Sequence, residues 1–143
     1  MNVLVLAHRA DQRDHRRMLG WLESEVNSGR PFVLADVVVS GVLRIITNPK
    51  IYRHPTTLEK AIAFVDGLLV QPTCLPLAAG ARHWRILREL LLDGDARANN
   101  VPDAHIAAIA LEQGATVATR DRGFARFERL SWFDPLADAA RTR

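Results

Sequence analysis

The chain has 143 residues, a formal net charge of +3, and a composition that is 48% hydrophobic and 24% charged. This balance is typical of one globular domain and excludes a disordered tail, a collagen-like fibre and a two-domain enzyme. The single cysteine, Cys74, excludes an internal disulfide and a cysteine-rich zinc site. The apolar runs are far shorter than the ~20 residues of a membrane span, and the N-terminus lacks a secretory signal. We therefore expect one cytoplasmic domain over residues 1–143, with a frayed tail at 137–143 and no membrane partner.

Arginine accounts for 17 of the 19 basic residues, because only Lys50 and Lys60 are lysines. The planar guanidinium binds phosphate through several donors, so this preference favours a nucleic acid or another acidic partner. A GC-rich genome raises the arginine content in the same way, and this alternative stays open. The densest basic group is predicted either to contact an RNA backbone or to solvate a helix, and it comprises Arg9, Arg13, Arg16 and Arg17.

The first half of the chain shows a strand pattern followed by helix patterns. Residues 3–7 are apolar without alternation, which is typical of a buried parallel strand. Asp11 is a suitable N-cap for a helix with apolar residues along one face, and Gly29 ends that helix. Residues 31–33 are predicted to form a turn, and residues 34–46 a buried helix. Thr56 and Glu59 have the spacing of a capping box, which predicts a helix from there to Leu69.

The second half continues the alternation. Residues 73–75 are predicted to be extended, and residues 79–92 to form an amphipathic helix with Trp84 on its apolar side. A further helix is predicted from Asp103 to Gly114, followed by a strand at 116–119, a helical turn at 124–127 and a last strand at 130–133. Strands that alternate with helices predict an α/β domain with a parallel sheet.

Two aspartates lie where such a sheet gathers its functional groups, at the carboxyl ends of the strands. Asp121 follows the strand at 116–119, and Asp103 opens the helix that leads into that strand. Carboxylates that are brought together repel one another unless a cation neutralises them, and oxygen ligands suit Mg²⁺ or Mn²⁺. A metal of this kind activates water for phosphodiester hydrolysis. The alternatives are an ordinary N-cap at Asp103 and an ordinary turn at Asp121.

Five segments form an ordered pattern along nearly the whole chain: 2–11 (NVLVLAHRAD), 41–49 (GVLRIITNP), 100–110 (NVPDAHIAAIA), 119–127 (TRDRGFARF) and 130–136 (LSWFDPL). The set resembles the PIN-domain ribonucleases, and within them the VapC toxins of toxin-antitoxin pairs. The resemblance implies a three-layer α/β/α fold around a central parallel sheet. It also implies that Asp103 is a Mg²⁺ ligand and that Asp121 is a second carboxylate beside the metal.

The same resemblance implies supporting roles for two polar residues. Thr119 would place a hydroxyl near the acidic cluster, and Asn2 would brace the cluster from the first strand. A strand-end position for Thr119 and a disordered terminus for Asn2 are the alternatives.

Two positions depart from the family pattern. The first aspartate of the family lies two positions before the residue that matches Asn2, so we expect the chain to begin inside its first strand. The second acid falls on Gly41, which cannot bind a metal. Asp36 is the candidate substitute, although five residues of helix turn it about 140° from the original direction, and a solvent-facing or capping role is the alternative. We expect impaired cleavage, which an extension containing Asp before Asn2 would restore.

The resemblance implies a metal-dependent endoribonuclease with Mg²⁺ or Mn²⁺ as cofactor. Its substrate would be structured RNA, either tRNA or rRNA, and its cleavage would inhibit translation. The resemblance further implies a homodimer and a VapB-like antitoxin. One alternative is a catalytically impaired PIN-fold binding module. Another is an α/β enzyme for a phosphorylated metabolite, which the lack of a glycine-rich phosphate loop disfavours.

Overall fold

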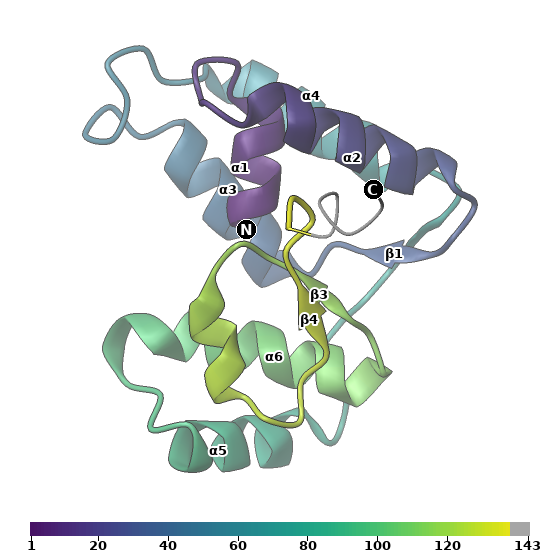
Figure 1. Cartoon of the computed structure of the whole chain (residues 1–143), viewed down its shortest axis with the longest axis vertical. Coiled ribbons are helices and arrows are strands. Elements are labelled where there is room, and N and C mark those ends of the chain that lie inside the picture. The colour runs from purple at the N-terminus through teal and green to yellow at the C-terminus, as the bar shows by residue number, and fades with distance from the viewer. Residues whose placement is uncertain (138–143) are drawn as a thin grey trace. The chain divides into compact units, whose positions relative to one another are not determined.

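The computed structural model describes residues 1–137, and the chain divides into two compact units, Met1–Leu77 and Ala78–Arg143 (Figure 1). Unit one contains α1 (Asn2–His8), α2 (His15–Asn27), β1 (Phe32–Val33), α3 (Asp36–Ile46), α4 (Leu58–Leu69) and β2 (Cys74–Leu75). Unit two contains α5 (His83–Asp93), η1 (Ala98–Asn100), α6 (Val101–Gln113), β3 (Val117–Ala118), η2 (Arg122–Arg126) and β4 (Trp132–Phe133). Of the predicted frayed tail, 138–143 lies outside the described residues. The prediction of a single domain stays a prediction.

The strands pair in parallel, as the sequence predicts for an α/β chain. In unit one β1 pairs with β2, and Phe32 lies opposite Cys74. In unit two β3 pairs with β4, and Val117 lies opposite Trp132. Residues 1–137 do not show the predicted three layers around one central sheet, because their strands form two separate pairs. Within the same residues no helix has both the length and the apolar character needed to cross a bilayer.

The strand predicted at residues 3–7 is wrong, because this segment is the helix α1. A short apolar run without alternation fits a buried helix as well as a buried strand. In the structure α1 packs against α2 and α3, and its apolar residues are buried on several sides. Leu4 and Val5 join Val42 and Ile46 of α3 in the core of unit one. The predicted brace at Asn2 therefore stands on the first residue of a helix and not on a strand.

The two side chains predicted to cap helices in unit one are bonded to other groups. Asp14, and not Asp11, precedes α2, and the Asp11 carboxylate forms an ion pair with Arg9. Thr57 caps α4 and accepts a bond from the Lys60 backbone N–H at 3.4 Å. The hydroxyl of Thr56, which the capping box required, instead lies 3.1 Å from a ring nitrogen of His8 and accepts a bond from Arg9.

The predicted turn at residues 31–33 is also wrong, because residues 32–33 form β1. The Phe32 backbone N–H donates to the Thr73 carbonyl oxygen at 2.9 Å, which joins this segment to the extended residues before β2. The extended segment predicted at 73–75 is confirmed as β2.

The helix α6 fills the centre of unit two. Five consecutive residues from Ile106 to Ala110 are buried, so the helix is apolar on nearly every side. Pro102 lies in its first turn, and Gly114 ends it with a left-handed backbone at φ 65°. These features confirm the helix predicted from Asp103 to Gly114 within the usual uncertainty of a helix start.

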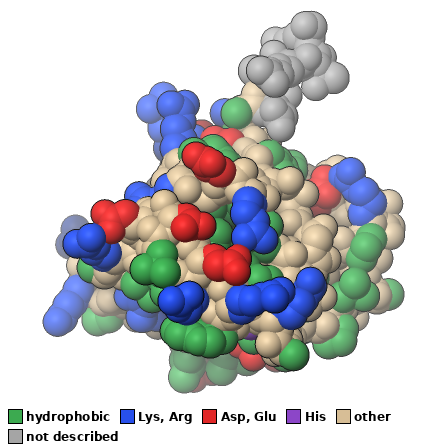
Figure 2. Space-filling model, turned by 90° about the horizontal axis from the view of Figure 1, so that it is seen from below, with side chains coloured by type: hydrophobic (Ala, Val, Ile, Leu, Met, Phe, Trp, Pro, Cys, Tyr) green, Lys and Arg blue, Asp and Glu red, His purple; other side chains and the backbone are tan. Residues whose placement is uncertain are grey.

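The helix α5 packs against α6 through Ile86, Leu87 and Leu90. The prediction that Trp84 lies on this apolar face is wrong, since its side chain is 67% exposed. The buried residues of α5 lie within about 60° of His83 around the helix axis, whereas position 84 is turned about 100° from His83 and so falls at the margin of that face. The space-filling view in Figure 2 shows basic, acidic and hydrophobic side chains interspersed.

Candidate functional site

Asp103 lies in the first turn of α6, and its side chain is half-buried. Burial raises the pKa of this carboxyl, and repulsion from the Asp121 carboxylate raises it further. The positive charge of Arg126 acts in the opposite direction and lowers the same pKa. The structure thus brings the two predicted carboxylates of unit two within electrostatic reach of one another.

Asp121 is fixed by the turn that follows β3. Its Oδ1 accepts a hydrogen bond from the Gly123 backbone N–H at 2.7 Å and caps the short helix η2. Its own backbone N–H donates to Oγ1 of Thr119 at 3.1 Å. Thr119 is 2% exposed and is held in turn by Phe133, whose carbonyl accepts from the Thr119 N–H at 2.9 Å. Thr119 therefore links the Asp121 backbone to the strand pair through these two hydrogen bonds.

Two arginines shape the charge around these carboxylates. Arg126 donates through Nε to the Gly123 carbonyl oxygen at 3.0 Å, so its side chain folds back along η2. Arg120, directly before Asp121, forms an ion pair with Asp134 at 3.6 Å. The sequence reasoning assigned no role to Arg126, although its place five residues after Asp121 in a single helical segment was an available signal.

The four arginines predicted to bind RNA lie in unit one and do not share one environment. Arg9 is 8% exposed, and its guanidinium bonds to Asp11, to the His54 carbonyl oxygen and to Thr56. The prediction that Arg9 contacts RNA is therefore corrected, because its donors are used within the chain. The other three are exposed, and their contact with RNA stays a prediction: Arg13, Arg16 and Arg17.

The comparison with known proteins decides the family. A model of the PIN domain matches residues 2–130. The chain belongs to the PIN-domain family. It is 47% identical to "VapC ribonuclease Mb2897" of Mycobacterium bovis over 95% of this chain and 92% of that protein. It is 37% identical to "Ribonuclease VapC25" of Mycobacterium tuberculosis over 94% of this chain and 95% of the relative. The predicted resemblance to VapC ribonucleases of the PIN family is confirmed.

Asp36 and Asn2, the other two residues predicted to contribute to the metal site, both lie in unit one. Asp36 is exposed in the first turn of α3, where its charge suits the helix N-terminus. Gly41, to which the sequence resemblance assigns the position of the family's second acid, is buried, and a Cβ atom there would fall on the thioether of Met1. The side chain of Met1 thus fills the space next to Gly41. Roles in metal binding for Asp36 and Asn2 stay predictions.

The carboxylates of this PIN domain fit part of a divalent cation site. Asp103 and Asp121 supply hard oxygen ligands, and a cation between them would remove the repulsion that raises the pKa of Asp103. Residues 1–137 contain no cluster of three or more His, Cys, Asp or Glu side chains arranged for a metal. Two carboxylates suit Mg²⁺ or Mn²⁺ that retains several of its waters.

Proposed function

We propose that this chain is a metal-dependent endoribonuclease and the toxin of a VapBC-type pair. Its substrate is structured RNA, tRNA or rRNA, whose cleavage inhibits translation in the cytoplasm. The PIN-domain match and the relatives named VapC ribonuclease support the proposal. The structural observation that carries it is the interacting pair Asp103 and Asp121, one of them half-buried, at the end of a parallel strand pair.

The residues of unit two have distinct tasks in this proposal. A bound Mg²⁺ would polarise the scissile phosphate and lower the pKa of a coordinated water. Asp103 and Asp121 would hold the ion, and Thr119 would keep the Asp121 backbone in place through its 3.1 Å hydrogen bond. The positive charge of Arg126 lowers the pKa of Asp103, and its guanidinium would be suited to bind a phosphate oxygen of the RNA strand.

The experiment is cleavage of a labelled RNA hairpin by the full chain, with Mg²⁺, with Mn²⁺ and with EDTA. We expect cleavage only with a divalent cation, and a loss of about 100-fold or more in Asp103→Asn and in Asp121→Asn, as for removal of one electrostatic group at a reacting phosphate. Asp93→Asn, which removes an exposed acid of the same unit, is the matched control and should retain activity. Equal cleavage by Asp103→Asn and the wild type would contradict the proposal.

A catalytically impaired binding module is the second candidate, and the packing at Gly41 favours it. No acid stands at that position, and Met1 occupies the adjacent space. In this case the chain would bind RNA without cutting it under any metal condition. The proposed partners are a VapB-like antitoxin and a second copy of the chain. Light scattering on the chain alone and with the product of a neighbouring small reading frame tests both.

A further inference from the structure

The connection between α3 and α4, residues 47–57, is an ordered loop that presents basic side chains. The Lys50 backbone N–H donates to Oδ1 of Asn48 at 2.8 Å, and the Asn48 carbonyl oxygen accepts from the Tyr52 N–H at 3.1 Å. At the base of the loop, the Thr56 N–H donates to the Ile46 carbonyl oxygen at 2.8 Å. These bonds fix the backbone of this segment, which we call the basic loop, while Lys50 and Arg53 stay exposed.

Arg9, at the end of α1, joins the basic loop to the N-terminal segment. Its Nη1 donates to the His54 carbonyl oxygen at 2.9 Å, and its guanidinium carbon lies 3.9 Å from the centroid of the Tyr52 ring. On its other side, Nε and Nη2 donate to the two carboxylate oxygens of Asp11 at 3.0 and 2.6 Å. A buried guanidinium is tolerated only with partners of this kind, so Arg9 holds one arrangement of the loop.

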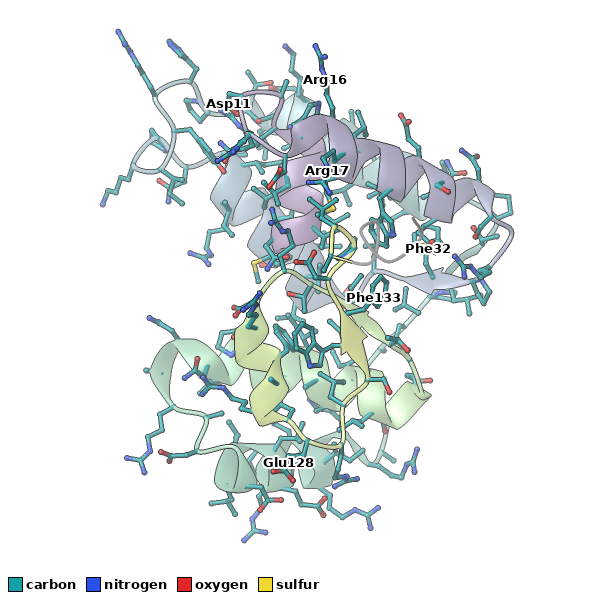
Figure 3. The ribbon with its side chains drawn as sticks, viewed as in Figure 1. Asp11, Arg16, Arg17, Phe32, Glu128 and Phe133 are labelled. Atoms are coloured by element: carbon teal, nitrogen blue, oxygen red, sulfur yellow. The ribbon has the colours of Figure 1, made fainter. Side chains whose placement is uncertain are left out.

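The two joined segments are strongly basic. Residues 9–17 and 47–57 together contain six arginines and lysines and two aspartates. Both aspartates are paired, Asp11 with Arg9 and Asp14 with Arg17. Asp11 and the upward-pointing Arg16 lie at the same end of unit one, while Arg17 lies lower on α2 (Figure 3). The two segments that the Arg9 contacts join therefore carry a net positive charge, and four of their basic side chains are exposed: Arg13, Arg16, Lys50 and Arg53.

We propose that Lys50 and Arg53 of the basic loop bind RNA phosphates together with Arg13 and Arg16, and that Arg9 is the positioning residue that fixes the loop. The inference rests on the proposed function, since it names a second region that holds the same substrate. RNA is favoured because exposed arginines and lysines on an ordered backbone attract phosphates, and because each phosphate contact releases counterions. Arg9 itself does not touch the RNA.

The test is fluorescence polarisation of a labelled RNA hairpin titrated with the full chain in EDTA, so that binding is separate from cleavage. Lys50→Ala/Arg53→Ala should raise the dissociation constant about tenfold near 0.15 M salt and reduce the slope of log K against log salt by about 1.4. Arg85→Ala/Arg88→Ala removes the same charge from the exposed side of α5 and is the matched control, with less than a twofold change expected.

The role of Arg9 is tested by a variant whose affinity for RNA should rise if only charge matters and fall if Arg9 positions the loop. Asp11→Asn removes a negative charge, so a purely electrostatic surface would bind RNA more tightly. Loss of the bidentate contact to Arg9 should instead weaken binding about threefold or more, and this effect should vanish when Lys50 and Arg53 are already alanine. Glu25→Gln, which removes the acid paired with Arg30 at 2.6 Å, is the control and should not weaken binding.

Four outcomes would contradict the proposed function, the proposed RNA contact of the basic loop, or the positioning role of Arg9. If the wild-type chain does not bind the hairpin, the proposed function and this inference both fail. If it binds and Lys50→Ala/Arg53→Ala equals the wild type or the α5 control, only the inference fails. Tighter binding by Asp11→Asn removes the positioning role of Arg9. Competition by polyglutamate as effective as by unlabelled RNA would assign the surface to an acidic protein instead. Circular dichroism confirms that each variant folds, and all the substituted side chains except Glu25 are exposed.

Discussion

Replacing Asp103 by asparagine should change stability in opposite directions without and with a divalent cation. Burial and Asp121 raise the pKa of Asp103, so the stability that this carboxyl contributes is present at acid pH and is lost as the pH rises through its folded-state pKa. At neutral pH, Asp103→Asn removes this unfavourable charge. Without metal, the variant should therefore have a higher Tm than the wild type, and the difference should shrink on acidification.

The expected effect of the metal follows from ligand linkage. At a free Mn²⁺ concentration ten times the dissociation constant, binding stabilises the folded state by about 1.4 kcal/mol. For 143 residues that unfold together, the entropy of unfolding is about 0.3 kcal/mol per kelvin, so Tm should rise by about 5 °C. Differential scanning fluorimetry over a Mn²⁺ series measures both effects. If Mn²⁺ raises the Tm of Asp103→Asn as much as that of the wild type and of the control Asp93→Asn, the proposed metal site is refuted.

Three further predictions concern stability. Burial, followed by the charge of Arg9, lowers the pKa of His8, so the unfolded chain binds more protons than the folded chain below about pH 6.5, and the free energy of unfolding should fall as the pH drops. Urea unfolding from pH 7.5 to 5 should show a smaller fall in His8→Gln than in the wild type. An identical fall in both proteins would contradict the assignment to His8. Met18→Ala should lower the free energy of unfolding by about 2–5 kcal/mol, because the Met18 side chain is 0% exposed. Trp84→Ala should change it by less than about 0.5 kcal/mol, because Trp84 is exposed, and equal effects of the two substitutions would show that Trp84 is buried. Gly114→Ala should destabilise by about 1 kcal/mol, since φ is 65° at the end of α6, and thermal unfolding that leaves Tm unchanged would argue against this cap.

The candidate carboxylates were accessible to sequence reasoning because their placement follows from short-range rules. The apolar run after Asp103, the glycine at position 114 and the strand before Asp121 lie within 19 consecutive residues. When a helix is followed by a strand that runs back along it, the end of the strand lies near the start of the helix, and the charge of Asp121 raises the pKa of Asp103. The family pattern identified the same two residues independently.

The role of Arg9 needed the tertiary structure, because the partners of a guanidinium are chosen by segments that are distant in the sequence. His54 lies 45 positions from Arg9, and no local pattern links the two residues. The same contacts occupy Thr56 and move the cap of α4 to Thr57.

Residues 3–7 illustrate the same division between local and tertiary information. Their apolar character correctly indicated burial, but the strand that it predicted is a helix, because a short apolar run fits both structures. Packing against α2 and α3 decided for the helix. Composition and periodicity thus indicated the burial of residues such as Leu4 and Val5 but not the exposure of Trp84, while the tertiary contacts decided what the buried residues meet. A buried polar group must find its hydrogen-bond partner wherever the folded chain supplies one.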